Sequence, residues 1–244
     1  MDCVILAAGY ATRLYPLTEN FPKPLLPVGG RPILDWLTED VSPCVERFFV
    51  VSNHRFAEQF SAWAGGQKAR VTVVDDGTMT NETRLGAVRD IEAALSAGAG
   101  GDCLIMAGDN VLDFSLRPFL TYAGEKGTSC VMRHEENRPA ALRKTAVITV
   151  NGEDLITSYE EKPAEPKGNW AVPPFYVYRA EDLALIPEAL AEGCSPDAPG
   201  SFAAWLSRRK PMHAWKMPGA RYDIGDLASY EAVRDSYKGP KAAE

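Results

Sequence analysis

The fold is decided by the stretch Leu6-Ala-Ala-Gly-Tyr-Ala-Thr-Arg-Leu-Tyr-Pro-Leu-Thr-Glu-Asn-Phe-Pro-Lys-Pro-Leu-Leu-Pro-Val28. It begins at the end of the apolar run Cys3–Ala7, which predicts a buried strand. Beyond that strand come glycine, small residues and threonine, with the cations Arg13 and Lys23 and no acid before Glu19. Small residues let backbone N–H groups approach an anion closely, and the two cations would neutralise it. We therefore expect a polyanion site beyond the carboxyl end of this strand, where open α/β sheets bind ligands.

The first half of the sequence alternates apolar strands with amphipathic helices. Strands are expected at Arg47–Ser52, Arg70–Val74 and Cys103–Ala107, and helices from Pro32, around Ala57–Trp63 and from about Arg84 to Ala97. This alternation is typical of βαβ units, in which helices cover both faces of a parallel sheet. The predicted fold class is α/β: a Rossmann-like three-layer α/β/α architecture with a central mixed, mostly parallel sheet and a small antiparallel substrate-binding portion.

After Asp113 the pattern becomes α+β. Two strand-like runs, Lys144–Val150 and Leu155–Glu161, flank Asn151-Gly152, which is a two-residue hairpin signal. The other expected elements are helices near 116–126, Ala180–Ala191, Gly200–Ser207 and Ala228–Tyr237, the last capped by Asp226, and strands at Ser129–Arg133, Ala171–Tyr178 and Met212–Lys216. We expect one domain at 1–237, whose halves 1–113 and 114–237 share one core, followed by a frayed tail at 238–244.

Composition narrows the function classes. The 244 residues carry a formal net charge of −7, which argues against a general nucleic-acid or membrane-surface binder. The five cysteines are scattered, with no Cys-x-x-Cys, so we expect free thiols in a reducing cytoplasm rather than a disulfide framework or a zinc site. No signal peptide precedes the first strand, and no apolar run approaches the ~20 residues that span a bilayer. The three histidines show no spacing that suggests a proton relay.

Several short motifs carry possible chemistry, and each also has a structural interpretation. Gly9 belongs to neither a P-loop nor a dinucleotide fingerprint, but prolines on both sides of Lys23 would hold that cation in place. Asp109 lies at the end of a buried strand, where it could bind Mg²⁺ beside phosphates or cap a turn. Asp223 has no evident structural task. Glu160-Glu-Lys-Pro163 ends a strand and is either a held cation or solvated surface.

Taken together and in order, these motifs resemble the sugar-1-phosphate nucleotidyltransferases, and most of all those of the glucose-1-phosphate thymidylyltransferase type. The resemblance rests on the opening loop with Pro22-Lys-Pro-Leu-Leu-Pro27, then Gly108-Asp-Asn, Glu160-Glu-Lys-Pro and Tyr222-Asp-Ile-Gly. It covers nearly the whole chain. It implies a nucleotide-binding half at 1–113, a sugar-phosphate-binding half at 114–237, and Mg²⁺ as cofactor.

The resemblance also implies residue roles. The catalytic set would be Arg13, Lys23, Asp109 and Asp223, with Asp109 and Asp223 as the metal ligands. The nucleoside triphosphate would be bound by Leu6, Ala7, Ala8, Gly9, Tyr10, Ala11, Thr12, Arg13, Lys23, Gly86 and Asp109. The phosphorylated acceptor would be bound by Asn110, Glu161, Lys162 and Val172, with Glu161 on the sugar and Lys162 on the phosphate.

Three positions depart from the family's pattern. The usual second glycine of the opening loop is Ala11, and a glutamine-containing stretch before the base-contacting glycine is replaced by Thr80-Asn-Glu-Thr-Arg84. Beside the sugar, Val172-Pro-Pro-Phe-Tyr176 stands in place of Thr-Gly. The last two departures put in question a thymine or uracil base and a glucose 1-phosphate acceptor.

The hypothesis is a cytoplasmic, Mg²⁺-dependent enzyme, monomeric or homo-oligomeric, that transfers a nucleoside monophosphate from a nucleoside triphosphate to a sugar 1-phosphate. Attack would be in line at the α-phosphorus, with pyrophosphate leaving. The first alternative is a cytidylyltransferase acting on another phosphorylated acceptor. The second is a non-catalytic nucleotide or sugar-phosphate binding module that regulates a partner. A dinucleotide-dependent oxidoreductase is disfavoured because the second and third fingerprint glycines are missing.

Overall fold

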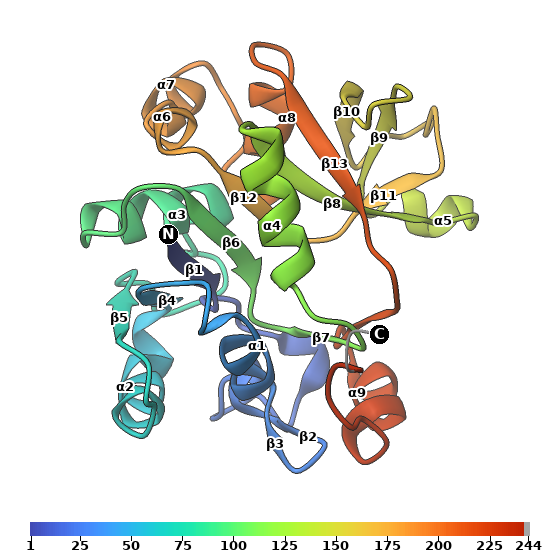
Figure 1. Ribbon diagram of the computed structural model, residues 1–244. Coiled ribbons are helices and arrows are strands. Elements are labelled where there is room, and N and C mark those ends of the chain that lie inside the picture. The colour runs from blue at the N-terminus through green and yellow to red at the C-terminus, as the bar shows by residue number, and fades with distance from the viewer. Residues whose placement is uncertain (242–244) are drawn as a thin grey trace.

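A ten-stranded sheet runs through the middle of the molecule (Figure 1). The structure is a computed structural model that describes residues 1–241. The strand order is β10-β9-β11-β8-β12-β6-β1-β4-β5, and β13 pairs with β8 beside this path. The strands are β1 (Asp2–Leu6), β4 (Phe48–Ser52), β5 (Val71–Asp75), β6 (Cys103–Ala107), β8 (Ser129–Glu135), β9 (Ala146–Val150), β10 (Ile156–Glu161), β11 (Trp170–Val172), β12 (Phe175–Tyr178) and β13 (Met212–Lys216).

The half of the sheet that comes from residues 1–113 is parallel, and its strand order leaves a crevice at the carboxyl ends of β1 and β6. β5, β4, β1 and β6 lie side by side, with β1 paired in parallel to both β4 and β6. The chain therefore leaves β1 towards one edge of the sheet and later returns on its other side at β6. Open α/β sheets bind ligands at such a switch point, just beyond the carboxyl ends of the strands.

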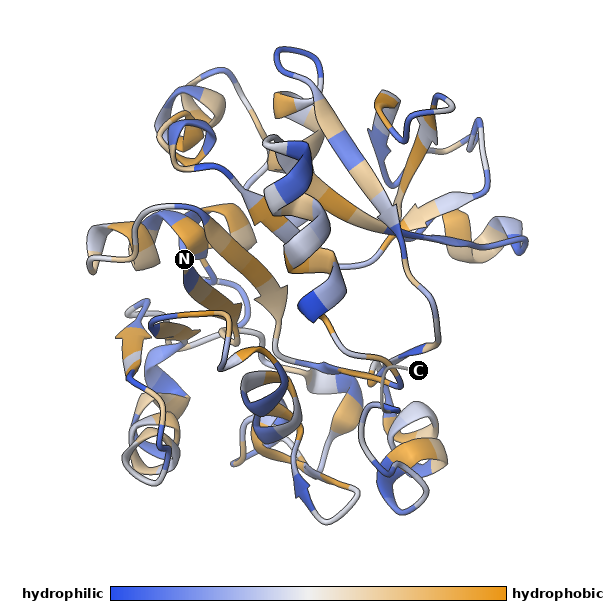
Figure 2. Ribbon diagram, viewed as in Figure 1, coloured by the Kyte–Doolittle hydropathy of each residue, from blue (hydrophilic) through white to orange (hydrophobic). Residues whose placement is uncertain are grey.

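Helices cover both faces of the sheet. The helices are α1 (Ile33–Val41), α2 (Ala57–Gly65), α3 (Ala87–Ser96), α4 (Arg117–Lys126), α5 (Pro139–Leu142), α6 (Ala180–Leu183), α7 (Ile186–Ala191), α8 (Pro199–Leu206) and α9 (Leu227–Arg234). One apolar cluster joins a sheet face to α1, α2, α4 and α9, and a second joins the other face to α3, α6, α7 and α8. Figure 2 shows hydrophobic colour along the central strands and both colours on the covering helices. The predicted three-layer fold with a parallel core is confirmed. No helix within residues 1–241 has both the length and the apolarity to cross a bilayer.

The second half of the sheet is antiparallel and more extensive than expected. The single strand expected at Ala171–Tyr178 is wrong, because Pro173-Pro174 divides it into β11 and β12. β11 pairs with β8 and β9, whereas β12 pairs with β6 and β8. Proline has no N–H for a ladder hydrogen bond, so the chain changes its neighbours at this point.

The hairpin of β9 and β10 forms as predicted, but the two-residue turn does not. The chain turns over 151–155, and the left-handed residue is Asp154, with φ of 65°, rather than Gly152. The Asn151 side chain accepts hydrogen bonds from the backbone N–H groups of Glu153 and Leu155, each at 3.0 Å. Asparagine thus organises a longer turn through its side chain, which the dipeptide signal does not reveal.

Two helices differ from the expected ranges for local reasons. The helix expected from Arg84 begins only at Ala87, because Gly86 has a φ of 92° that no helix accommodates. The helix expected at Ala180–Ala191 is divided into α6 and α7. Pro187 lies near the start of α7, and its ring would clash with the carbonyl four residues earlier, at the end of α6.

Two short antiparallel ribbons were not predicted from the sequence. β2 (Pro27–Val28) pairs with β3 (Arg31–Pro32), and β7 (Asn110–Leu112) pairs with β14 (Arg221–Asp223). The second ribbon joins segments that are far apart in the sequence. After it, Asp226 caps α9 as predicted, in a capping box with Ser229.

The described part of the tail does not fray. The backbone N–H of Lys241 donates to Asp113 at 2.9 Å, and its ammonium lies 2.9 Å from the Asp113 carboxylate. Residues 238–241 therefore pack back onto the start of the second half, and the expectation of a frayed tail is wrong for them. Residues 242–244 lie outside the described part of the chain.

A buried hydrogen bond joins Tyr237, just after the end of α9, to β7. Removing it should lower the stability of the protein by a measurable amount. The Tyr237 hydroxyl donates to the carbonyl of Leu112 at 2.6 Å. Tyr237→Phe leaves that buried carbonyl without its partner, so we expect the free energy of unfolding in urea to fall by about 1–2 kcal/mol. Tyr222→Phe is the matched control, because this tyrosine is 38% exposed. Equal losses in both variants would contradict the assignment.

Candidate functional site

The candidate site lies beyond the carboxyl ends of β1 and β6, where two cavities adjoin. The first has a volume of about 380 Å³ and the second about 840 Å³. The residues that line both are Leu6, Arg13, Ala87, Ala107 and Asp109. The first cavity borders the opening loop, and the second borders the antiparallel half of the sheet. The arrangement can bring two ligands together at Asp109.

The opening loop forms one wall of the first cavity. All eight positions from Leu6 to Arg13 line it. A Cβ built on Gly9 would meet no protein atom within 4 Å, so glycine keeps this part of the cavity open rather than relieving a clash. Ala11 is left-handed, with φ of 47°, and its carbonyl accepts a hydrogen bond from Thr18 at 2.8 Å. Ala11 therefore takes the backbone conformation that glycine adopts more easily.

Lys23 and Asp109 form the central ion pair of the site. The Lys23 Nζ lies 2.6 Å from Asp109 Oδ2, and the lysine is only 8% exposed. Lys23 begins a short 3₁₀ helix between two prolines, so its backbone is fixed as predicted. The other Asp109 oxygen accepts a hydrogen bond from the Asn110 side chain at 2.6 Å. Both oxygens of this carboxylate are thus oriented by neighbouring groups.

The ribbon of β7 and β14 brings Asp223 to the same place. Asp223 pairs with Asn110 in the ribbon, and the backbone N–H of Ile224 donates to the carbonyl of Asp109 at 3.2 Å. Both aspartates line the second cavity. Partial burial in the cleft and the negative charge of Asp109 raise the pKa of the Asp223 carboxyl. Two carboxylates that repel each other across shared space suit a divalent cation between them.

The residues present would supply part of the coordination shell of Mg²⁺. Within residues 1–241 no group of three or more acidic, histidine or cysteine side chains could hold a metal ion. Mg²⁺ is usually bound by one or two protein carboxylates, with water and substrate oxygens completing its coordination. Asp109 and Asp223 would supply that number.

Arg13 lies where the two cavities meet. Its guanidinium packs against Gly225, where an added Cβ would stand 3.7 Å from Nη2. The guanidinium makes no ion pair with any residue of the part of the chain that the structure describes. An arginine without a carboxylate partner at a cavity border is available to bind a phosphate group.

The expected acceptor residues divide into two groups. Asn110 lines the second cavity, but Glu161, Lys162 and Val172 do not. These three instead adjoin residues of its wall. The Lys162 N–H donates to the carbonyl of Thr145 at 3.2 Å, and the Val172 carbonyl accepts from the Thr145 hydroxyl at 3.1 Å. Glu161 packs against Gly200, next to the lining residue Pro199, and burial raises the pKa of its carboxyl.

Several cationic residues of the second cavity were missed at the sequence level. Arg138 and Lys144 flank α5, and Arg221 lies on β14. Arg138 is paired with Glu136. Arg221 donates to Asn110 at 2.5 Å and also lies 3.8 Å from the Asp223 carboxylate. Nothing in their local sequence distinguishes these residues from surface cations, because only the packing of α5 and β14 turns them towards one space.

The lining of the first cavity also includes Gly86 and Asp90. A Cβ on Gly86 would lie 2.6 Å from the carbonyl oxygen of Pro196, so glycine is required here for close packing as well as for its φ. Asp90 lies on the buried face of α3, together with Val88 and Ile91. An acid within the apolar face of an amphipathic helix is a sequence signal that could have identified this residue.

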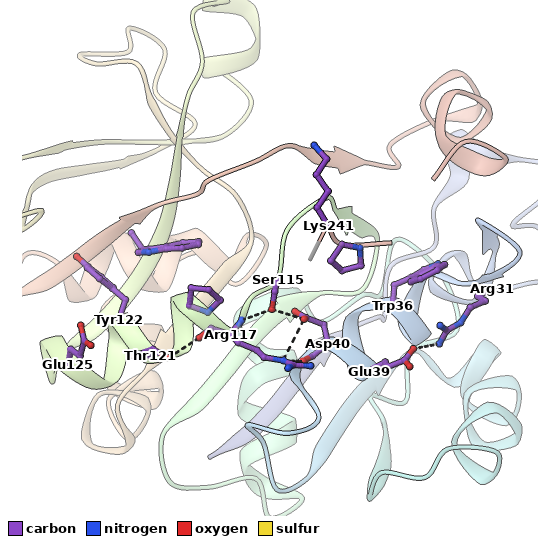
Figure 3. A pocket seen from close by; sticks show the side chains of 13 residues that line it. Arg31, Trp36, Glu39, Asp40, Ser115, Arg117, Thr121, Tyr122, Glu125 and Lys241 are labelled. Carbon is purple, nitrogen blue, oxygen red and sulfur yellow. Dashed lines mark hydrogen bonds and ion pairs between the residues drawn. The ribbon is translucent and has the colours of Figure 1, made fainter. Parts of the chain in front are cut away.

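A third hollow, of about 900 Å³, lies away from this site (Figure 3). It is bordered by α1, α4 and the end of the described chain, and it contains none of the expected residues. Its charged side chains largely satisfy one another: Arg31 pairs with Glu39 at 2.5 Å, and Asp40 accepts from Ser115 at 2.7 Å (Figure 3). We assign no function to it.

Comparison with known proteins agrees with this geometry. The model of the nucleotidyl transferase family matches residues 2–238. The chain is 32% identical over 165 residues to the bifunctional protein GlmU of Methanococcus vannielii, covering 68% of this chain and 36% of that protein. It is 28% identical over 208 residues to the glucose-1-phosphate thymidylyltransferase of Mycobacterium tuberculosis, covering 83% of this chain and 67% of that enzyme.

The structure is also similar to solved structures. A Bacillus anthracis protein described as a glucose-1-phosphate thymidylyltransferase, in complex with a sucrose, superposes with a TM-score of 0.84 at 22% identity, covering 99% of this chain and 98% of that one. At this identity the likeness establishes the fold alone. The chain spans little more than a third of the length of the M. vannielii relative.

The buried carboxyl of Asp90 should make stability depend on pH. Burial, and then the charge of Asp76, raise its pKa from 3.8 to about 7. Between these values the unfolded chain binds fewer protons than the folded chain, so ionisation of Asp90 lowers stability as the pH rises. We therefore compare the free energies of unfolding of Asp90→Asn and the unmodified protein. From pH 4 to pH 8 the difference between them should shift by about 4 kcal/mol in favour of Asp90→Asn.

Urea titrations at a series of pH values measure this effect. Glu92→Gln is the matched control, because it removes one acid from the same helix outside the cavity. A constant difference between Asp90→Asn and the unmodified protein across this pH range would contradict the raised pKa.

Proposed function

The chain belongs to the nucleotidyl transferase family, and we propose that it transfers a nucleoside monophosphate from a nucleoside triphosphate to a sugar 1-phosphate. The products would be an NDP-sugar and pyrophosphate. The observation that carries the proposal is the meeting of two cavities at the Lys23–Asp109 pair, with Asp223 beside it. Two polyanions must come together in this reaction, and a site with two compartments and cations at their border suits that need.

The first cavity would bind the nucleoside triphosphate. Its opening loop would place backbone N–H groups and Arg13 against the phosphates, with the open space at Gly9 allowing close approach. Lys23 would neutralise the charge that develops as pyrophosphate leaves. Its burial and fixed backbone support this role, because a pre-oriented cation in a water-poor site stabilises a transition state without reorganising.

The reaction needs positioning more than covalent chemistry. A phosphate monoester is already ionised at neutral pH, so its oxygen can attack the α-phosphorus without a general base. Mg²⁺, held by Asp109 and Asp223, would supply charge neutralisation at the reacting phosphates. The protein's share is to hold the acceptor oxygen in line with the bond that breaks, using the walls of the second cavity.

The phosphate of the acceptor would be bound by a lysine in or beside the second cavity. Lys162, by its resemblance to the family, is the first choice, and its φ of 48° fixes the backbone beside Thr145. Lys144 is the alternative, because it lines the cavity itself. Neither ammonium has an ion-pair partner among residues 1–241, so both remain available to an anion.

A cytidylyltransferase acting on a different acceptor is the second candidate function. Pro174 lines the second cavity where relatives of the thymidylyltransferase type carry a glycine backbone, which supports an acceptor other than glucose 1-phosphate. A non-catalytic binding module has no such support, since Lys23, Asp109 and Asp223 are all retained and brought together. As part of the same proposal, we place the enzyme in the cytoplasm, where the buried, unpaired thiols of Cys3 and Cys103 suit a reducing compartment.

Pyrophosphate release tests the proposed reaction. The protein with Mg²⁺, each of five nucleoside triphosphates and a panel of sugar 1-phosphates should release pyrophosphate with at least one pair. Asp223→Asn and Lys23→Ala should lower kcat by about 100-fold or more, because each removes charge stabilisation at the reacting groups. Asp235→Asn, outside the cavities, is the control. Full Mg²⁺-dependent turnover by folded Asp223→Asn, or no release with any pair, would overturn the proposal.

Acceptor kinetics test which lysine binds the phosphate of the acceptor. Lys162→Ala should raise the KM for the acceptor about 10-fold or more and leave the KM for the nucleotide unchanged, because it removes a charged contact to the phosphate alone. Lys167→Ala is the control, since Lys167 is exposed and paired with Glu160 at 3.0 Å. An unchanged acceptor KM in Lys162→Ala, together with a raised one in Lys144→Ala, would transfer the role to Lys144.

A further inference from the structure

Asp90 is a buried carboxyl that the proposed chemistry does not use. It is 6% exposed, and it lines the first cavity from the first turns of α3. Its side chain makes no hydrogen bond and no ion pair within the described chain, and its Oδ1 is completely buried without a partner. Burying a carboxyl without hydrogen bonds costs several kcal/mol. A residue kept at such a cost beside a ligand cavity is a candidate for ligand recognition.

The position of Asp90 within the cavity points to the base rather than the phosphates. The cations and the opening loop form one wall, with Arg13 and Lys23 beside Asp109. The other residues of the lining, which we call the α3 wall, are Asn81, Arg84, Gly86, Ala87, Asp90 and Asp197. They adjoin one another, since the backbone N–H of Ala87 donates to the carbonyl of Asp197 and the Arg84 side chain lies 3.4 Å from the Asp197 carboxylate. A triphosphate bound by the opening loop and its cations would leave the α3 wall, which includes Asp90, for the base.

This wall is rich in hydrogen-bond acceptors. Arg84, its one cation, is directed to Asp197 at 3.4 Å and to the carbonyl of Asn81 at 2.9 Å. Asp76, close enough for its charge to raise the pKa of Asp90, also has a buried carboxylate oxygen without a partner. The ligand that complements such a wall is one that presents N–H groups.

On the basis of the proposed function, we infer that Asp90 reads the nucleotide base and selects one that carries an exocyclic amino group. Cytosine, adenine and guanine present an NH₂ group on the edge used in base pairing, and this group can donate to the carboxylate. Uracil and thymine present only a ring N–H between two carbonyl oxygens, whose lone pairs would face the carboxylate. A buried acceptor opposite another acceptor is left unpaired, which weakens binding more than the loss of a single contact.

The departure of Thr80–Arg84 from the thymidylyltransferase pattern agrees with this inference. The glutamine expected there could offer both a donor and an acceptor to a thymine or uracil base. In this chain the stretch precedes a wall on which a carboxyl, an acceptor when ionised, takes over the recognition. The absence of the glutamine and the presence of Asp90 both favour a base that donates hydrogen bonds over one that accepts them.

Base preference in Asp90→Asn tests the inference. Asparagine has the shape of aspartate but adds an N–H donor that can satisfy a carbonyl oxygen. At pH 8 the unmodified protein should have a kcat/KM for its best amino-bearing nucleotide (CTP, ATP or GTP) at least about 10-fold above that for UTP and dTTP. Asp90→Asn should lower this ratio about 10-fold or more. Glu92→Gln, on the same helix outside the cavity, should leave the ratio unchanged.

Direct binding separates this inference from the proposed reaction. Dissociation constants of the five Mg²⁺-nucleotides are measured by calorimetry on the unmodified protein, Asp90→Asn and Glu92→Gln. Selective binding of an amino-bearing nucleotide that Asp90→Asn abolishes, without turnover on any acceptor, would support Asp90 and overturn the transfer reaction. Turnover that prefers UTP or dTTP, or a preference that Asp90→Asn leaves unchanged, would overturn the role of Asp90 and leave the transfer reaction standing.

Discussion

The ion pair between Lys23 and Asp109 is the contact on which the site depends. It joins the proline-bounded segment after the opening loop to the tip of β6, with 2.6 Å between its charged atoms. The backbone of Asp109 also accepts from Ile224, which holds the β14 segment beside it. One aspartate thus connects three segments, and both cavities border it. A buried lysine needs such a partner, because an unpaired ammonium in the interior is costly.

The sheet explains why the two cavities adjoin. Its parallel strands β1 and β6 end side by side at the switch point, which leaves a crevice where open α/β sheets bind ligands. Its antiparallel strands extend the same sheet beyond β12 and support α5 and the walls of the second cavity. The two proline residues between β11 and β12 let the chain pair first with β8 and β9 and then with β6 and β8. One continuous sheet therefore fixes the relation of the two compartments.

Asp90 destabilises the folded protein at the position where we propose that it contacts the base. Its burial raises the pKa of its carboxyl to about 7, so ionisation of Asp90 near and above neutral pH destabilises the folded protein. An acid in the first turn of α3 is favourable to the helix dipole, but the core gains nothing from it, since the neighbours Val88 and Ile91 are fully buried. Unfavourable groups that persist in a fold are characteristic of functional sites, where a ligand relieves the cost.

The sequence by itself determined the family and the parallel half of the fold. Strand–helix alternation is a local pattern, and the opening loop with Lys23 is contiguous, so both can be read along the chain. Only the tertiary structure brought Asp223 to Asp109, through a ribbon whose strands are about a hundred residues apart. It also turned Lys144 into the second cavity and left Asp90 buried without a partner. Pairing between distant segments and burial are properties of the folded chain, since neighbours along the sequence do not specify them.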